Sequence, residues 1–532
     1  MSLAYFWIFF VLLAIGTPVV FALLAAPGLS LVLDGQDGRF FAKLLSQTYS
    51  GMYSFPLMAV PFFILAGELM NTGGITRSIV RFSESMIGHV RGGLAQVNIL
   101  SSILFAGLSG SAVADTSALG KMLIPAMEEN GYSRRFAAAI TAASSVIGPI
   151  IPPSGIMVLY AFVMNVSVAG LFLAGFMPGL LVGLGLMALT GWFARIRNYP
   201  VAARRSTWKE SSLAFLKTFP ALVTPVLLLG GILSGIYTPT EAAAVAAVYA
   251  LFASVLIRTE RWRRFIDNPV HAYLHVGPLT LLLFAGFTDY VGVFLFFSVG
   301  LAWIVIAEIL WRTVFRERRA AAAAATGAAA PDDPDRGQSW SGAVNATART
   351  LPKILTDTAL QSGVILLLVG AAVTFGWMVT VSGLAREAAS WIQTVTDNPY
   401  FLFFLVNILL FIVGMFLDAG PAILILGPVL GPIMYQIGID PLHFAIVMCV
   451  NVTVGLATPP MGLVLFVAAS VSGERVESIV REIWPFLAIE FAVIFLITYF
   501  PSVSMTLPAL AGFARCPEGA TLCHTLTGLI GG

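Results

Sequence analysis

The chain has 532 residues, of which 58% are hydrophobic and 11% are charged, and its mean hydropathy is +0.90. Soluble domains carry roughly a quarter charged residues, so this composition excludes a soluble protein, and a net charge of +2 indicates no nucleic-acid partner. We predict an all-α polytopic protein with about 11 full spans of roughly 20 residues each in the lipid bilayer.

The first two apolar runs, Tyr5–Leu33 and Phe55–Met70, are predicted to be spans. The first run lacks the basic region and the small-residue cleavage site of a signal peptide, so we expect it to be retained. Counting crossings from a cytoplasmic start places the carboxyl terminus in the periplasm. There Cys516 and Cys523 could form a disulfide, because the periplasm is oxidising.

Basic residues gather between the apolar runs, which places these loops in the cytoplasm. The clusters are His89–Arg91, Arg134–Arg135, Arg195–Lys217, Arg258–Arg264 and Arg312–Arg319. Phe219–Ile236 and Ala242–Ile257 are predicted to form a tight helical hairpin. An apolar stretch between the last two clusters should cross the membrane twice or not at all. The Ala/Pro/Asp/Gly-rich segment after it is typical of a flexible linker.

The chain repeats its glycines and prolines at an offset of 307 residues (459 minus 152). The matched residues are Gly107, Pro125, Gly131, Gly148, Pro152, Pro153, Gly155 and Pro178 in the first copy, and Gly414, Pro432, Gly438, Gly455, Pro459, Pro460, Gly462 and Pro485 in the second. An odd number of crossings separates the copies, so they should be inverted. Inverted repeats with interrupted helices indicate a secondary transporter that binds its substrate near the midplane.

Each copy contains an apolar run with a polar, glycine-bearing tip, Gly107–Ser117 or Gly414–Pro421. Too few residues flank each tip for two full spans. We therefore predict two re-entrant helical hairpins, the first entering from the cytoplasm and the second from the periplasm.

Each copy also contains a double-proline break, Gly148–Gly155 or Gly455–Gly462. Two consecutive prolines remove backbone donors and exclude the preceding residue from the helix, so the helix must unwind. Free backbone groups at membrane depth persist only where they line a cavity or meet a ligand. Carbonyl and hydroxyl oxygens suit sodium, and the amino ends of half-helices attract a carboxylate.

At these residues the chain resembles the large subunit, DctM type, of the tripartite ATP-independent periplasmic (TRAP) transporters. The resemblance rests on Ser54–Met70, Gly107–Asp115, both double-proline breaks and Gly235–Glu241. It implies an elevator mechanism driven by a sodium gradient, with sodium as the coupling ion, no other cofactor, and no enzymatic activity. It also implies a bacterial inner-membrane location, a small membrane subunit, and a periplasmic substrate-binding protein that delivers an organic acid.

The resemblance also nominates site residues. Those for sodium or substrate are Ser109, Gly110, Ser111, Asp115, Gly148, Pro152, Pro153, Ser154, Gly155, Gly414, Asp418, Gly455, Thr458, Pro459, Pro460 and Gly462. The sodium ligands are expected among Ser109, Ser111, Gly414 and Thr458. Asp115 could instead be a buried helix-capping carboxylate.

The same resemblance suggests a division into domains. We expect scaffold spans at 1–95, a first inverted repeat at 96–194, a scaffold hairpin at 195–257, an inserted hydrophobic pair at 258–319, a flexible cytoplasmic linker at 320–345, a scaffold span with an amphipathic segment at 346–400, a second inverted repeat at 401–507 and a periplasmic tail at 508–532.

Other interpretations remain open at this point. Glu68 and Glu490, near predicted span ends, could meet a partner helix or a scaffold cation, and His443 is predicted to be interfacial. A single-component sodium/anion symporter or an ion antiporter would share the inverted hairpins. A membrane enzyme would need a catalytic cluster, which five scattered histidines do not provide.

Overall fold

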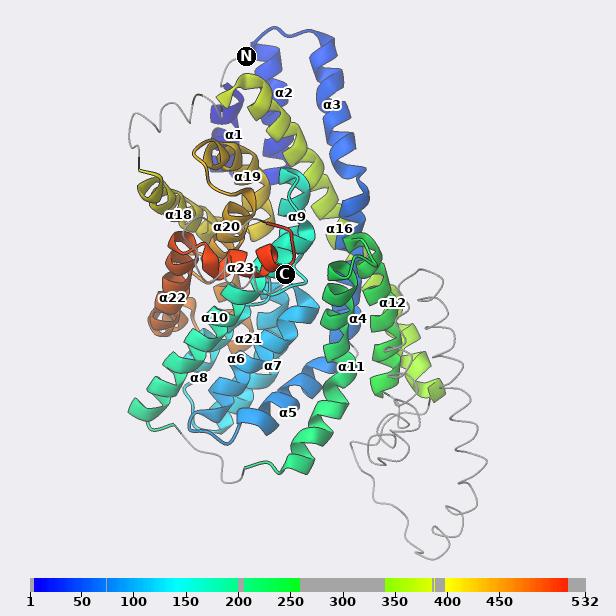
Figure 1. Cartoon of the computed structure of the whole chain (residues 1–532), viewed down its shortest axis with the longest axis vertical. Coiled ribbons are helices and arrows are strands. Elements are labelled where there is room, and N and C mark those ends of the chain that lie inside the picture. Colours follow the sequence, from blue (N-terminus) through cyan, green and yellow to red (C-terminus); the bar gives the residue numbers. More distant parts are fainter. Residues whose placement is uncertain are drawn as a thin grey trace, which may run out of the picture.

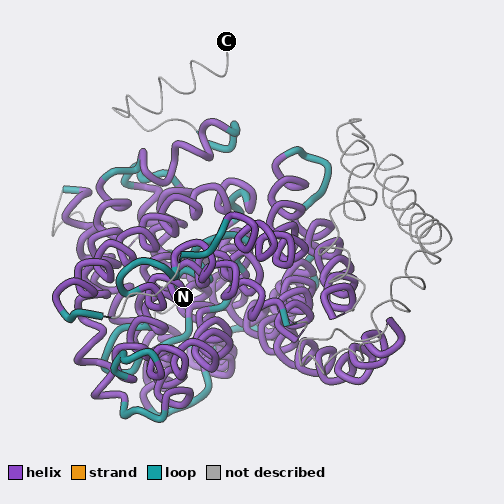
Figure 2. Tube along the Cα trace, turned by 90° about the horizontal axis from the view of Figure 1, so that it is seen from below, coloured by secondary structure: helices purple, strands orange, loops and turns teal. Residues whose placement is uncertain are grey.

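The computed structural model describes residues 4–72, 74–199, 205–258, 340–384, 387 and 398–514. Within these residues the regular elements are all helices, as predicted (Figures 1 and 2). By length and composition, four described helices could cross a membrane, or up to six if two bent pairs each count as one span. The inserted pair and most of the linker (259–339), and the tail cysteines Cys516 and Cys523, lie outside the described residues.

One group of helices comes from the amino-terminal part and the middle of the chain. Its members are α1 (Ala4–Ala14), α2 (Val19–Leu33), α3 (Gly38–Met52), η1 (Phe55–Met58), α4 (Ala59–Thr72), α5 (Ile75–Ile87), α11 (Trp208–Leu233), α12 (Pro239–Arg258) and α16 (Trp340–Ser382). Helix α16 has 43 residues, which corresponds to roughly 65 Å. It packs against α2, α3 and α4 and extends to the other group of helices.

The prediction of one uninterrupted span over Tyr5–Leu33 is wrong. The run forms two helices, α1 and α2, which pack against each other. Gly16 between them has a left-handed backbone with φ of 85°, and Pro18 disfavours a helical conformation at Thr17. Apolar composition alone did not reveal this turn.

The second group contains the two repeats. The first repeat is α6 (Gly93–Ser109), α7 (Ala112–Glu129), α8 (Arg134–Ser145), α9 (Gly155–Met164) and α10 (Val168–Ile196). The second is α18 (Pro399–Phe416), α19 (Ala419–Gln436), α20 (Pro441–Gly455), α21 (Leu463–Ser472) and α22 (Val476–Tyr499), followed by α23 (Ser502–Leu510). Helices α7 and α19 both have 18 residues and start 307 residues apart (419 minus 112), so the sequence repeat is also a repeat of helices.

Each hairpin packs against one half-helix of its own repeat and one of the other repeat. Helix α7 packs against α8 of its own repeat and α21 of the other, whereas α19 packs against α20 of its own repeat and α9 of the other. The half-helices α8 and α21 thus lie beside the first hairpin, and α20 and α9 lie beside the second. The two broken helices therefore run in opposite directions, as expected for inverted copies (Figure 1).

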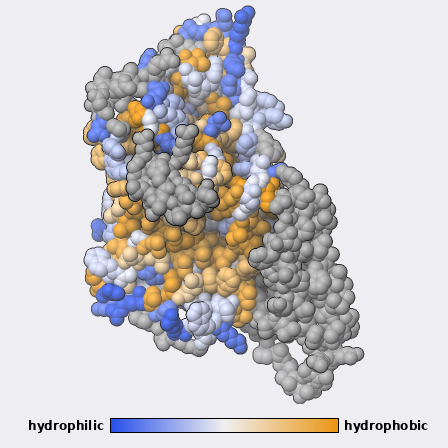
Figure 3. Space-filling model, viewed as in Figure 1, coloured by the Kyte–Doolittle hydropathy of each residue, from blue (hydrophilic) through white to orange (hydrophobic). Residues whose placement is uncertain are grey.

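The surface has the polarity of a membrane protein. Hydrophobic residues gather in a band across the middle of the face in Figure 3, and hydrophilic residues lie towards both ends. The connections from α5 to α6, from α7 to α8 and from α10 to α11, which carry basic clusters, meet at one end of the molecule (Figure 1). Helix α1 starts at the opposite end, so, contrary to the sequence-based prediction, the start of the chain and these basic clusters cannot both lie in the cytoplasm.

An ion-pair network joins the two repeats at this basic end. Glu482 of α22 lies 2.8 Å from Arg197 at the end of α10 and 3.4 Å from Arg135 of α8. The guanidinium of Arg197 also lies over the rings of Phe136 and Phe193, 5.3 and 4.9 Å from their centroids. One carboxylate thus connects elements of both repeats, and the two cation–π contacts add to the attraction.

We expect Glu482→Gln to lower the free energy of unfolding by about 1 kcal/mol, because two partly exposed arginines lose their shared carboxylate. The thermal unfolding midpoint of the detergent-purified protein should fall. Glu477→Gln, on an exposed site of the same helix, is the matched control. Equal midpoints for the two variants at low salt would contradict a stabilising network.

Candidate functional site

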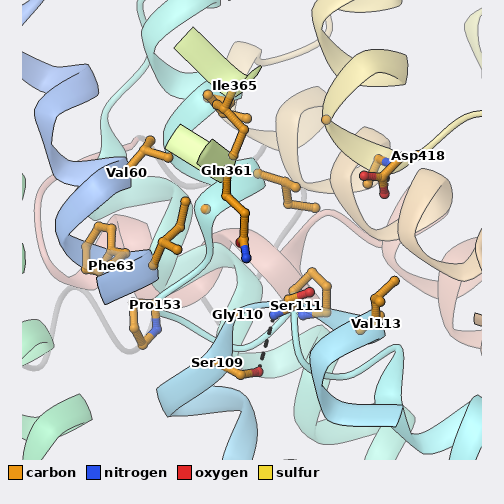
Figure 4. A pocket seen from close by; sticks show the side chains of 18 of the residues that line it. Val60, Phe63, Ser109, Gly110, Ser111, Val113, Pro153, Gln361, Ile365 and Asp418 are labelled. Carbon is orange, nitrogen blue, oxygen red and sulfur yellow. Dashed lines mark hydrogen bonds between the residues drawn. The ribbon is translucent and has the colours of Figure 1, made fainter. Parts of the chain in front are cut away.

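The first hairpin turns at Gly110, between α6 and α7. Gly110 has a left-handed backbone with φ of 59°. The Ser111 N–H donates to the hydroxyl oxygen of Ser109 at 3.3 Å, and the Ser111 hydroxyl accepts from the N–H of Ala114 at 3.4 Å. Ser111 is therefore the amino-terminal cap of α7, and both serines are held at the tip (Figure 4).

Asp115 is fully buried one turn into α7. The Ser109 hydroxyl donates to its Oδ1, whereas its Oδ2 has no hydrogen-bond partner among the described residues and lies against Gly148 of the first break. Since Ser111 caps α7, the alternative in which Asp115 caps the helix does not hold. Asp115 instead joins the tip to the break and presents one free carboxylate oxygen there.

The first break separates α8 from α9. Residues 146–154 are buried and contain a cis peptide bond between Pro152 and Pro153. Ser154 then caps α9 by accepting from the N–H of Met157 at 3.4 Å. A Cβ atom on Gly110 would lie 2.8 Å from the carbonyl oxygen of Pro153, so the tip backbone meets the break of its own repeat directly.

The second repeat has the same arrangement with different side chains. Asp418 caps α19 by accepting from the N–H of Ala419 at 2.8 Å. A Cβ atom on Gly455, where α20 ends, would lie 2.6 Å from the backbone of Gly414. Thr458 is buried in the break and donates to the carbonyl oxygen of Val454 at 2.9 Å. The next two residues, Pro459 and Pro460, again share a cis peptide bond.

A cavity of about 580 Å³ lies between the two groups of helices (Figure 4). Four helices begin at it, because its lining includes residues of the first turns of α7, α9, α19 and α21: Ala112, Val113, Gly155, Ile156, Ala419, Gly420 and Leu463. Among the described residues, the lining contains one acidic residue, Asp418, and no Lys, Arg or His. The positive dipole ends of four helices, together with the first-turn N–H groups that no cap occupies, are thus its main attraction for an anion.

The structure brings together six of the predicted site residues in the wall of this cavity: Ser109, Gly110, Ser111, Pro153, Gly155 and Asp418. The others do not line the cavity and lie where tip and break meet or where the break unwinds: Asp115, Gly148, Pro152, Ser154, Gly414, Gly455, Thr458, Pro459, Pro460 and Gly462. All of them are buried except Pro459, which is half-buried, and Pro460, which is exposed.

Sequence reasoning missed the part of the wall that belongs to α4, α11 and α16. Gln361 of α16 and Thr224 of α11 line the cavity there. Gln361 directly precedes the predicted span Ser362–Ser382, and α16 begins 22 residues earlier than that span (362 minus 340). A polar residue at the edge of an apolar run is only a weak indication of a binding residue when the helix face on which it lies is unknown.

Two further polar residues lie elsewhere than predicted. Glu490 is in the interior of α22, fully buried, and neither carboxylate oxygen has a partner among the described residues, so no scaffold cation meets it there. His443 is buried rather than interfacial, and its Nε2 lies 2.9 Å from the carbonyl oxygen of Ile497. Glu68 is half-buried in α4.

Comparison with known proteins supplies a family. Residues 6–286 and 297–503 match the family described as "Tripartite ATP-independent periplasmic transporter, DctM component". The chain is 34% identical to the "Sialic acid TRAP transporter large permease protein SiaM" of Vibrio cholerae, over 94% of this chain and 96% of that protein. It is 31% identical to the "2,3-diketo-L-gulonate TRAP transporter large permease protein YiaN" of Escherichia coli, over 92% and 95%.

A third relative is the "C4-dicarboxylate TRAP transporter large permease protein DctM" of Pseudomonas aeruginosa, 32% identical over 86% of this chain and 88% of that protein. Among solved structures, MtrF of Neisseria gonorrhoeae is similar with a TM-score of 0.50 and 13% identity, over 86% of this chain and 83% of that one. At that identity the similarity concerns the fold alone.

Proposed function

Because the chain belongs to the DctM component family of the tripartite ATP-independent periplasmic transporters, we propose that it is the large permease subunit of a sodium-coupled importer of a small organic anion. The three relatives above are named for sialic acid, 2,3-diketo-L-gulonate and C4-dicarboxylates, which are all organic acids. That the relatives are permeases supports a transport function rather than an enzymatic one.

One observation carries this proposal. Four helices have their amino ends at one cavity, and no basic side chain of the described residues lines that cavity. A carboxylate there can accept hydrogen bonds from first-turn N–H groups and lies at the positive end of each helix dipole. No net positive charge is built into the wall. Binding of the anion should therefore benefit strongly from a cation bound nearby.

We place the sodium sites at the same turns, where each tip meets its break. The carboxyl ends of α6, α8, α18 and α20 lie there, and their carbonyl oxygens have lone pairs that can coordinate a cation. In the first repeat, Oδ2 of Asp115 is a buried carboxylate oxygen without a partner among the described residues, which fits a hard cation. Ser109, Ser111 and Gly148 would complete this site, and Gly414, Asp418, Gly455 and Thr458 would form the other.

The transport movement is proposed to be an elevator. The two repeats form one packed group, and each tip meets the break of its own repeat in direct backbone contact. Separating tip from break would leave backbone polar groups unpaired in hydrocarbon at several kcal/mol each. Moving both hairpins as one body against α4, α11 and α16 avoids this cost.

The partners follow from the family. We propose that the subunit works in the bacterial inner membrane with a small membrane subunit and with a periplasmic substrate-binding protein. The binding protein would deliver the organic acid to the cavity.

Thr458→Ala should raise the sodium concentration for half-maximal uptake several-fold with little effect on folding. The change removes one hydroxyl oxygen in the second break, and the one hydrogen bond of this hydroxyl among the described residues goes to the carbonyl oxygen of Val454 in α20. Initial uptake rates in proteoliposomes, measured against sodium concentration, test this. An unchanged sodium curve would remove Thr458 from the site.

The proposed function is tested by reconstituting the chain with the small subunit. Uptake of a labelled organic acid should require both an inward sodium gradient and the loaded binding protein. Uptake by the chain alone, without the binding protein, would favour a single-component symporter instead. Uptake that is independent of sodium would contradict the coupling.

A further inference from the structure

The wall of the cavity formed by α4, α11 and α16 is mostly apolar. Its apolar residues are Val60, Phe63, Ile64, Ala66, Met70, Leu228, Leu360, Val364, Ile365 and Leu368. The polar side chains on this wall are Gln361 of α16 and Thr224 of α11. If the repeats slide against this wall, apolar side chains alone would suit it best. The two polar side chains therefore indicate an additional function for this wall.

Gln361 is directed towards the hairpin tip. Its amide group points to the region of Gly110, Ser111 and Pro153 (Figure 4). It is exposed to the cavity, and it has no hydrogen bond to any residue that the structure describes. The amide can therefore bond to a molecule held between α16 and the tip, as donor or as acceptor.

Thr224 gives an independent indication of a ligand. Its side chain is 2% exposed, and its hydroxyl oxygen has no hydrogen-bond partner among the described residues. A buried hydroxyl without a partner costs free energy, which a ligand or a water molecule in the cavity would recover. Both polar groups of this wall are thus free to bond to the contents of the cavity.

The charges around the cavity limit what the molecule can be. The helix amino ends accommodate one carboxylate, but no Lys, Arg or His in the part of the chain that the structure describes lines the cavity to pair with a second one. Gln361 and Thr224 are neutral and suit an uncharged oxygen. The apolar residues around them suit an apolar body.

We propose that Gln361 and Thr224 contact the substrate and select a monocarboxylate with an apolar body and an uncharged hydroxyl or oxo oxygen. This inference rests on the proposed function. The carboxylate lies at the helix amino ends, and the neutral oxygen bonds to Gln361 and Thr224. Thr224 of α11 and Gln361 of α16 belong to helices that are proposed to stay fixed. They would therefore contact the substrate when the repeats have the position described here.

The test compares three acids by thermal stabilisation of the detergent-purified protein in sodium buffer. These are 2-hydroxy-4-methylpentanoate, 4-methylpentanoate, which lacks the hydroxyl, and succinate, which has a second carboxylate. The hydroxy acid should bind about tenfold more tightly than 4-methylpentanoate, as expected for one or two hydrogen bonds. Succinate should bind more weakly than both.

Gln361→Leu and Thr224→Val remove the polar groups at similar size. Each should reduce the preference for the hydroxy acid to about threefold or less and leave the affinity for 4-methylpentanoate unchanged. Thr356→Val is the matched control on α16, because Thr356 is exposed outside the cavity and should keep the full preference. Using two variants guards against misfolding of one of them.

A preference that survives both substitutions would overturn the assignment of these residues. Tighter binding of succinate, or binding of none of the three acids, would overturn the substrate class. If sodium-driven uptake of another organic acid is measured at the same time, the proposed function stands and this inference alone fails.

Discussion

Gly455→Ala is expected to reduce sodium-driven uptake at least tenfold. The added Cβ atom would lie 2.6 Å from the backbone of Gly414, where α20 meets the second hairpin. Neither side can yield easily, because both contact surfaces are backbone rather than flexible side chains. Overpacking of this kind costs about 1–3 kcal/mol. We expect this strain to raise the barrier of the transport step, which slows tenfold for each ~1.4 kcal/mol.

The matched control is Gly230→Ala in α11, where an added Cβ atom has nothing within 4 Å. That variant should transport like the unchanged protein. Uptake is to be normalised to the amount of monodisperse protein, so that loss of folded protein is separated from loss of transport. Near-normal uptake by Gly455→Ala would show that hairpin and break need not touch this closely.

Asp115→Asn is expected to raise the sodium concentration for half-maximal uptake tenfold or more. Asparagine keeps an oxygen that can accept from the Ser109 hydroxyl, but it replaces the free Oδ2 by an amide NH₂ group that cannot bind a cation. The substitution also removes the negative charge that attracts a cation to this buried position. The measurement is the sodium dependence of initial uptake rates in proteoliposomes.

Ser109→Ala is the companion variant to Asp115→Asn. It removes the hydrogen bond at the tip together with one proposed sodium ligand, and it leaves the carboxylate in place. If Asp115 only fastens the tip, Asp115→Asn should behave like the unchanged protein and Ser109→Ala should be the more harmful change. That result would remove Asp115 from the sodium site.

The repeated helices and their breaks could be predicted because they depend on residues with strong local effects. Two adjacent prolines cannot remain in a helix, and Pro152–Pro153 and Pro459–Pro460 fall in non-helical segments. The helices begin at matching positions, to within one residue, in both copies because the same glycines and prolines recur.

The residues missed or misplaced depend on three-dimensional packing. Whether Gln361 faces lipid or the cavity depends on the rotation of α16, which periodicity in an apolar helix does not specify. The burial of His443 depends on α22, whose Ile497 carbonyl oxygen it contacts. The turn at Thr17–Pro18 was overlooked because a single proline often only kinks a membrane helix.

The most direct test of the whole account is whether both hairpin tips change their exposure together. Cysteines replace Val113 at the first tip and Gly420 at the second, both of which line the cavity, in a protein without Cys449, Cys516 and Cys523. Ser234→Cys, at the end of α11, is the fixed reference.

The cysteines are labelled in proteoliposomes with a membrane-impermeant thiol reagent, with and without sodium and the loaded binding protein. The account predicts that labelling at 113 and 420 changes together while labelling at 234 stays constant. Constant labelling at both tips, under conditions where uptake is measurable, would contradict movement of the repeats as one body.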